Sequence, residues 1–75
     1  MEDKIKEFLK ENLQDVESVV LAQAFEDTEY RFSAIYIIAK IGNYRHTDKY
    51  FVDVCKVQDR IAVYSLSLTI SQPFN

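Results

Sequence analysis

The stretch Ile61-Ala62-Val63-Tyr64-Ser65-Leu66-Ser67-Leu68-Thr69-Ile70-Ser71 decides the expected fold, because its apolar and hydroxyl-bearing residues alternate. Successive side chains of a β-strand point to opposite faces of a sheet, so a period of two marks a strand with two different faces. An antiparallel sheet that packs one face on a core and exposes the other has this pattern. The stretch therefore predicts a strand over 61–71 whose apolar face lies on the core.

Three earlier runs, over 16–25, 30–41 and 50–57, are also rich in β-branched and aromatic residues, which favour strands. Short polar segments separate the four runs. A parallel connection needs a crossover of a dozen or more residues, and these separators are shorter than that. Neighbouring strands should therefore run antiparallel, as a four-stranded meander.

The beginning of the chain has a helical period instead. Ile5, Phe8, Leu9 and Leu13 fall on one stripe of a helix over about 2–14, and charged residues take most of the other positions. Seventy-five residues suffice for one domain. We therefore expect a single α+β domain over 1–75, with one N-terminal helix packed on the four-stranded antiparallel sheet.

Turn lengths set the expected strand register. A three-residue loop over 58–60 pairs Val57 with Ile61 and sets Val54 opposite Tyr64, which keeps Asp53 on the face away from the helix. A loop over 42–49 pairs Ile41 with Tyr50. The face expected to pack on the helix then consists of Val20, Ala22, Ala24, Ile35, Ile37, Ala39, Ile41, Tyr50, Val52, Val54, Tyr64, Leu66, Leu68 and Ile70.

The same register makes the opposite face of the sheet apolar as well. Its expected members are Phe32, Ala34, Tyr36, Ile38, Phe51, Cys55, Val57, Ile61 and Val63. One helix cannot cover both faces, and monomers rarely leave a patch of several hundred Å² in water. A second copy of the chain is the favoured cover, with two sheets about 10 Å apart. Another protein is the next choice, and a bent second strand that hides the patch internally is the third.

This reasoning predicts a small non-enzymatic protein-interaction module, with a homo-oligomer, most simply a dimer, as the favoured form. The expected partner-binding residues on the sheet are Phe32, Tyr36, Ile38, Phe51, Val57 and Val63. Tyr44 and Arg45, in the predicted loop, join them because tyrosine and arginine are frequent at binding hot spots.

Single-stranded nucleic-acid binding is the alternative function. Sheet aromatics can stack on bases, and Arg45, Lys49 and Arg60 would supply positive charge. Residues 1–29 carry nine acidic and three basic side chains, a balance of −6, and residues 30–75 carry six basic and three acidic ones, a balance of +3. A charge of +3 is small for binding phosphates, so this alternative is less favoured.

The sequence predicts no catalytic residues, cofactor or metal site. It has one histidine (His46), one cysteine (Cys55) and one glycine (Gly42), too few for a disulfide, a zinc site or a glycine-rich phosphate loop. No apolar run approaches the roughly 20 residues of a membrane span. The charged N-terminus does not fit a signal peptide, and a lone thiol suits a reducing compartment, so we expect a cytoplasmic protein.

Overall fold

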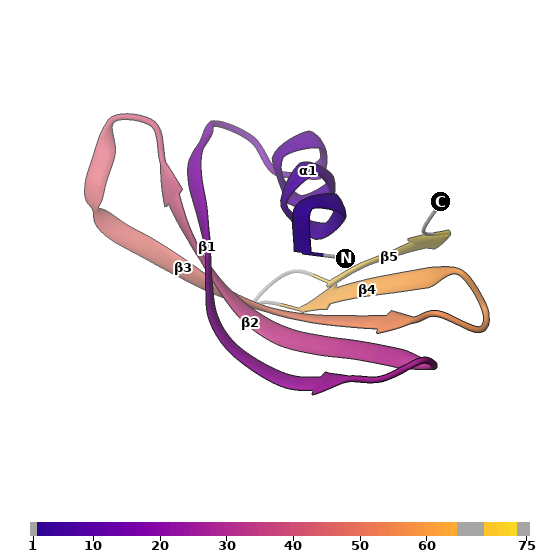
Figure 1. Ribbon diagram of the computed structural model, residues 1–75. Coiled ribbons are helices and arrows are strands. Elements are labelled where there is room, and N and C mark those ends of the chain that lie inside the picture. Colours follow the sequence, from indigo (N-terminus) through magenta and orange to yellow (C-terminus); the bar gives the residue numbers. More distant parts are fainter. Residues whose placement is uncertain (1, 65–68, 74–75) are drawn as a thin grey trace.

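The computed structural model describes residues 2–64 and 69–73, with side chains for 2–42 and 47–64. The elements are α1 (Glu2–Asn12), β1 (Val16–Asp27), β2 (Arg31–Lys40), β3 (Asn43–Cys55), β4 (Arg60–Tyr64) and β5 (Thr69–Pro73). The strands form one antiparallel sheet in the order β1-β2-β3-β4-β5, and α1 lies on one face of it (Figure 1). The predicted class, an N-terminal helix on an antiparallel meander, is confirmed.

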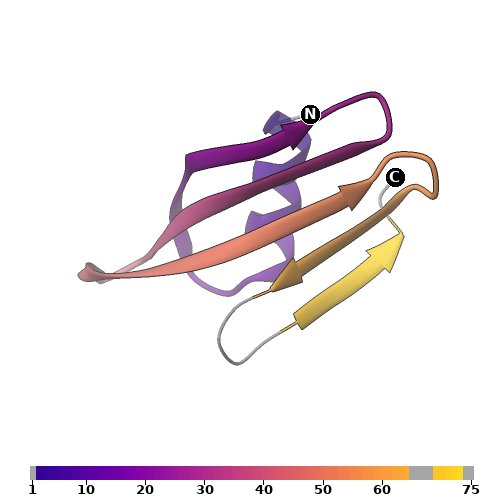
Figure 2. The same ribbon diagram turned by 90° about the horizontal axis from the view of Figure 1, so that it is seen from below.

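The structure divides the run predicted as one strand over 61–71 into a hairpin. β4 ends at Tyr64, and β5 returns beside it with Thr69 opposite Tyr64. Figure 2 shows β5 at the edge of the sheet, next to β4. Leu66 and Leu68, which were expected to face the helix, lie outside the described residues. The meander therefore has a fifth strand after the four that were predicted.

The core lies between α1 and the sheet. The predicted helical stripe supplies Ile5, Phe8, Leu9 and Leu13, all of them buried. The sheet supplies Val19, Phe32, Ala34, Tyr36, Ile38, Tyr50, Val52, Val54, Ile61 and Val63. Because α1 is the one helix among the described residues, it determines which face of the sheet is sheltered from water.

Backbone contacts fix the chain where α1 passes into β1. Asp15 has a positive φ of 56°, which turns the chain sharply after the helix. Its carbonyl oxygen accepts a hydrogen bond of 2.7 Å from the Ile41 amide. The Lys40 Nζ donates one of 2.6 Å to the Gln14 carbonyl oxygen. The end of the helix is thereby held against the far end of β2.

Edge strand β1 is bent by three irregularities. Its pairing with β2 shifts between Val16 and Ser18, between Leu21 and Gln23, and between Ala24 and Glu26. Such bulges add an unpaired residue and increase the local twist, and they also make an edge strand a poor template for further strands. They change the faces as well. Val19 is 7% exposed and Val20 is 54% exposed, so placing Val20, Ala22 and Ala24 on the core was wrong.

The two faces of β2 are exchanged relative to the prediction. Gly42, with φ of +78°, makes a tight turn, and β3 begins directly after it at Asn43 rather than at Tyr50. The expected loop over 42–49 is therefore mostly strand. Val54 pairs with Phe32 instead of Ile37, a shift of five positions. Because five is odd, every β2 side chain moves to the other face.

An odd shift in register also exchanges the two faces of β4 relative to the prediction. Its turn with β3 spans four residues, 56–59, and Asp59 has a φ of 51°. Val54 pairs with Ile61 instead of Tyr64, an odd shift of three positions. The structure therefore buries six residues that were expected on the open face, namely Phe32, Ala34, Tyr36, Ile38, Ile61 and Val63. The core positions expected in β3, Tyr50, Val52 and Val54, are confirmed.

Two neighbouring isoleucines test this register. Ile38 is fully buried on the helix side, whereas Ile37 is partly exposed on the other face. Ile38→Ala should lower the free energy of unfolding by about 2–5 kcal/mol because it leaves a cavity. Ile37→Ala should lower it by roughly 1 kcal/mol, since less apolar area leaves water. Denaturant unfolding at low protein concentration measures both, and a larger loss for Ile37→Ala would contradict the observed register.

Candidate functional site

The candidate site is the face of the sheet turned away from α1, which we call the outer face. Strand alternation and pairing define it. Its described members on the three central strands are Arg31, Ser33, Ile35, Ile37 and Ala39 of β2, Thr47, Lys49, Phe51, Asp53 and Cys55 of β3, and Arg60, Ala62 and Tyr64 of β4. No helix covers this face among the described residues (Figure 1).

An aromatic row crosses the middle of the outer face. Phe51 pairs with Ile35 on one side and with Tyr64 on the other. Its ring centroid lies 6.1 Å from those of both Phe25 and Tyr64, in tilted geometries that are favourable for aromatic pairs. Phe25 and Tyr64 are 53% and 42% exposed. The row, Phe25, Phe51 and Tyr64, thus presents a broad apolar surface to water.

The bulge in β1 explains how Phe25 reaches this row. Phe25 is the extra residue between the Ala24–Ala34 and Glu26–Ser33 pairs. In such a bulge two consecutive side chains lie opposite one partner residue, so Phe25 and Glu26 share the outer side. Glu26 pairs with Ser33, which is itself an outer-face residue paired with Asp53, and this agrees with the placement.

One ion pair interrupts the apolar surface. The Arg31 Nε donates to Asp53 Oδ1 at 2.7 Å, and a terminal guanidinium nitrogen donates to Oδ2 at 2.5 Å. This hydrogen-bonded guanidinium lowers the pKa of the Asp53 carboxyl, although partial burial opposes the shift. In return, the carboxylate raises the pKa of Arg31. The outer position expected for Asp53 is correct, but the sequence reasoning missed its partner.

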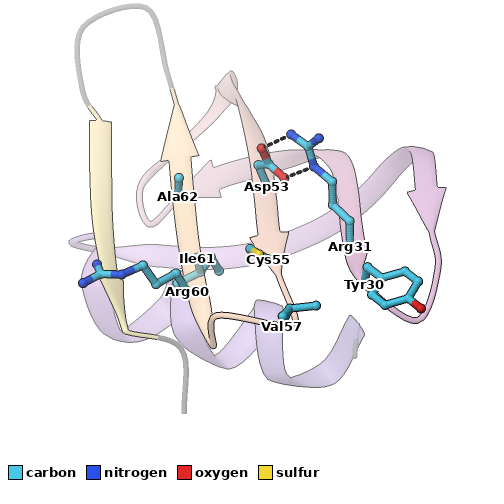
Figure 3. Close-up of a pocket in the computed structure, with 8 residues that line it drawn as sticks. All are labelled: Tyr30, Arg31, Asp53, Cys55, Val57, Arg60, Ile61 and Ala62. Carbon is cyan, nitrogen blue, oxygen red and sulfur yellow. Dashed lines mark hydrogen bonds and ion pairs between the residues drawn. The ribbon is translucent and has the colours of Figure 1, made fainter.

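A shallow depression lies at one end of the outer face, beside the turns of two hairpins. Its volume is about 460 Å³, and its lining residues are Tyr30, Arg31, Asp53, Cys55, Val57, Arg60, Ile61 and Ala62 (Figure 3). The Lys56 amide donates to the Tyr30 carbonyl at 2.8 Å, and its Nζ bonds to the Thr28 carbonyl oxygen and to Asp27. These bonds hold the two turns together and fix that end of the depression.

The cationic groups around this depression do not converge on one point. Figure 3 shows the Arg31 guanidinium turned toward Asp53 and the Arg60 side chain extending toward β5. Cys55 lies between these two arginines in the ladder, paired with both. Its side chain shares the space with the apolar Val57 and Ala62. The depression is therefore a surface trough suited to apolar contact.

The structure separates the predicted partner-binding residues into three groups. Phe51 lies on the outer face and Val57 in the adjoining turn, where Val57 is exposed. Phe32, Tyr36, Ile38 and Val63 are in the core, where they cannot touch a partner. The side chains of Tyr44 and Arg45 are outside those that the structure describes. Sequence reasoning missed Val20, Phe25, Ile35, Ile37 and Tyr64.

Tyr36 shows how far one of the predicted contacts is from the surface. Its ring is completely buried, and its hydroxyl has no hydrogen-bond partner among the described residues. Burial, and secondarily the negative charge of Glu2, raise the pKa of Tyr36 to about 12. This side chain contributes to packing under α1 and is not available for binding.

The described part of the chain holds no cluster of three or more side chains able to ligate a metal ion. Within residues 2–64 and 69–73, no helix has the length and apolar content required to cross a membrane. The chemistry that the outer face offers is thus apolar and aromatic contact, with one ion pair and flanking positive charges.

Comparison of the chain with models of protein families, with curated proteins and with solved structures finds no match.

The ion pair of the outer face makes stability depend on pH. The folded-state pKa of Asp53 lies below the unfolded value of about 3.9, so the stabilisation is complete above that value and is lost as pH falls through the folded one. Asp53→Asn should therefore be less stable than the unmodified chain at pH 6, and the difference should shrink below pH 4. Denaturant unfolding across this range measures it. Asp48→Asn is the control at an exposed carboxylate. A difference in stability between Asp53→Asn and the unmodified chain that grows as the pH falls would contradict the lowered pKa of Asp53.

Proposed function

We propose that this protein is a small non-enzymatic interaction module whose outer sheet face binds another protein chain. The observation that carries the proposal is the aromatic row, which lies exposed on the one sheet face that α1 leaves uncovered. An additional chain on the outer face would remove apolar surface that this chain alone leaves in water.

The composition of the outer face supports a protein partner. Interface cores are rich in aromatic residues and arginine, and their rims are polar. Here the aromatic row is central, the Arg31–Asp53 pair adjoins it, and Lys49 lies toward the margin. The binding chain is either a second copy or a different protein. We place this activity in the cytoplasm, where the lone Cys55 would remain a thiol.

Site-specific crosslinking tests this proposal. A photoreactive phenylalanine analogue replacing Tyr64 should form adducts with a protein chain after irradiation in native cell extract, since Tyr64 lies on the outer face. The matched control carries the same analogue at Ile41, which is 64% exposed but lies in the β2–β3 turn. Adduct yield at position 64 should exceed that at 41 severalfold and should fall when Phe51→Glu is added. Equal yields at both positions would exclude the outer face as the binding surface.

Single-stranded nucleic-acid binding is a second candidate, which the aromatic row also favours. Aromatic side chains on an open sheet can each stack on one base. Lys49 and Arg60 come from the same face as Phe51 and Tyr64 and could contact phosphates. The net charge of −3 opposes this candidate, because binding to nucleic acid depends largely on positive charge.

Fluorescence anisotropy with a 12-nucleotide oligo(dT) or oligo(U) decides the second candidate. If the protein binds these strands, affinity should fall at least tenfold between 50 and 200 mM salt, as released counterions require. The changes Arg60→Ala, Lys49→Ala and Arg45→Ala should each weaken binding and reduce the dependence on salt. If no binding is detected, or if the affinity does not change with salt concentration, nucleic-acid binding is excluded as the function.

A further inference from the structure

We infer that the chain covering the outer face is a second copy, related by a two-fold axis that runs parallel to the strands, over the boundary between β2 and β3. The inference rests on the proposed function and specifies its partner. In this arrangement the two sheets pack face to face, with β1 of one copy over β4 of the other and β2 over β3. The helices α1 then lie on the two outer sides of a four-layer assembly.

The size of the face is sufficient for such a dimer. Strands β1, β2 and β3 each span about ten paired residues, and β4 spans five. With about 4.8 Å between strands and about 3.3 Å per residue, each copy offers roughly 550 Å² of sheet, or about 1,100 Å² in total, which exceeds the roughly 1,000 Å² expected of a biological interface. At its centre Ile35 and Phe51 are apolar and partly exposed, as the core of an interface requires.

The aromatic row matches itself across this axis. The strand order places Ile35 of β2 over Phe51 of the second copy, and Phe25 of β1 over Tyr64 of the second copy. Because of the two-fold symmetry each contact occurs twice, with the roles of the two copies exchanged, as in any isologous interface. The row thus meets apolar side chains along its whole length and buries its exposed rings.

The polar residues are compatible with the same axis. Asp53 lies over Ser33 of the second copy, and Arg31 over Cys55 of the second copy, so no like charges are opposed. At the margins, acidic Glu26 on β1 lies over Ala62 on β4 of the second copy, one position along the same face from Arg60. Arg60 forms no ion pair with the side chains that the structure describes. The second copy therefore supplies an acidic partner for it.

The other face-to-face arrangement is less favourable. A two-fold axis perpendicular to the strands keeps β1 over β1, and with the axis above the row that holds Asp53 it brings the two Glu26 carboxylates together. Asp53 then also meets Asp53 of the second copy. Like charges opposed across an interface are costly, and they suppress the wrong pairing. Above the Phe51 row the same axis would instead set Asp53 over Lys49 of the second copy, but at every position it keeps β1 away from β4, so Arg60 gains no contact with Glu26. The contact between Glu26 and Arg60 therefore distinguishes the axis parallel to the strands.

Sedimentation equilibrium between 1 and 200 μM tests the dimer and its orientation. The unmodified chain should reach twice the chain mass of 8.8 kDa. Phe51→Glu should remain monomeric, because a carboxylate would be buried without a partner. The control Ile41→Glu places the same charge in the exposed turn and should dimerise normally. Far-UV circular dichroism confirms that each variant is folded.

Charge exchange then tests the orientation. Glu26→Arg and Arg60→Glu should each weaken the dimer about five- to tenfold, and the double variant should recover to within about threefold, since it restores opposite charges. A dimer without this recovery would overturn the proposed axis. A chain that stays monomeric at 200 μM would overturn the second copy as partner. If the chain is monomeric but the analogue at Tyr64 crosslinks to a different protein, the proposed function holds and only the second copy is excluded as partner. If no adduct forms, both the proposed function and the dimer are excluded.

Discussion

One helix can shelter only one face of this sheet, and that constraint determines where the protein exposes apolar surface. The stripe of α1 packs on the even-numbered residues of β2, such as Tyr36 and Ile38, which lose all contact with water. The odd-numbered residues of the same strand have no equivalent cover among the described elements. Since Ile35 and Ile37 are apolar too, the outer face becomes an unsheltered hydrophobic surface whose exposure a partner would relieve.

The class of fold follows from local patterns, whereas the register does not. The stripe of α1 and the strand-like runs suffice to predict a helix on an antiparallel meander. The register depends on turn lengths, and Gly42 forms a tight turn before a strand whose first half is polar. A polar run of this kind resembles a loop in sequence, because its pairing with β2 is a tertiary effect that composition does not record.

A local cue could have oriented β2 and β4 correctly. Arg31 and Ser33 share a face with Ile35, so the predicted core face of β2 would have contained a guanidinium. Arg60, which the prediction placed in the loop over 58–60, belongs to β4 and shares a face with Ala62 and Tyr64. Assigning the β2 side chains to the wrong faces nevertheless did not affect the expectation that the sheet has a second apolar face. Both faces of β2 are apolar, so exchanging them changes the identity of the exposed residues while an exposed apolar face remains.

In the proposed complex, the Arg31–Asp53 pair would make the outer face selective among partner surfaces. Both hydrogen bonds of the pair are made within the chain, so a partner can cover it without leaving either charge unpaired. Covering still removes water from two ions, and the attraction within the pair must offset that loss. A partner that places a hydroxyl or a thiol over the pair adds little further cost, whereas one that places a second carboxylate there adds repulsion. In the proposed complex, the aromatic row would therefore supply most of the attraction, and the ion pair would restrict which surfaces can bind.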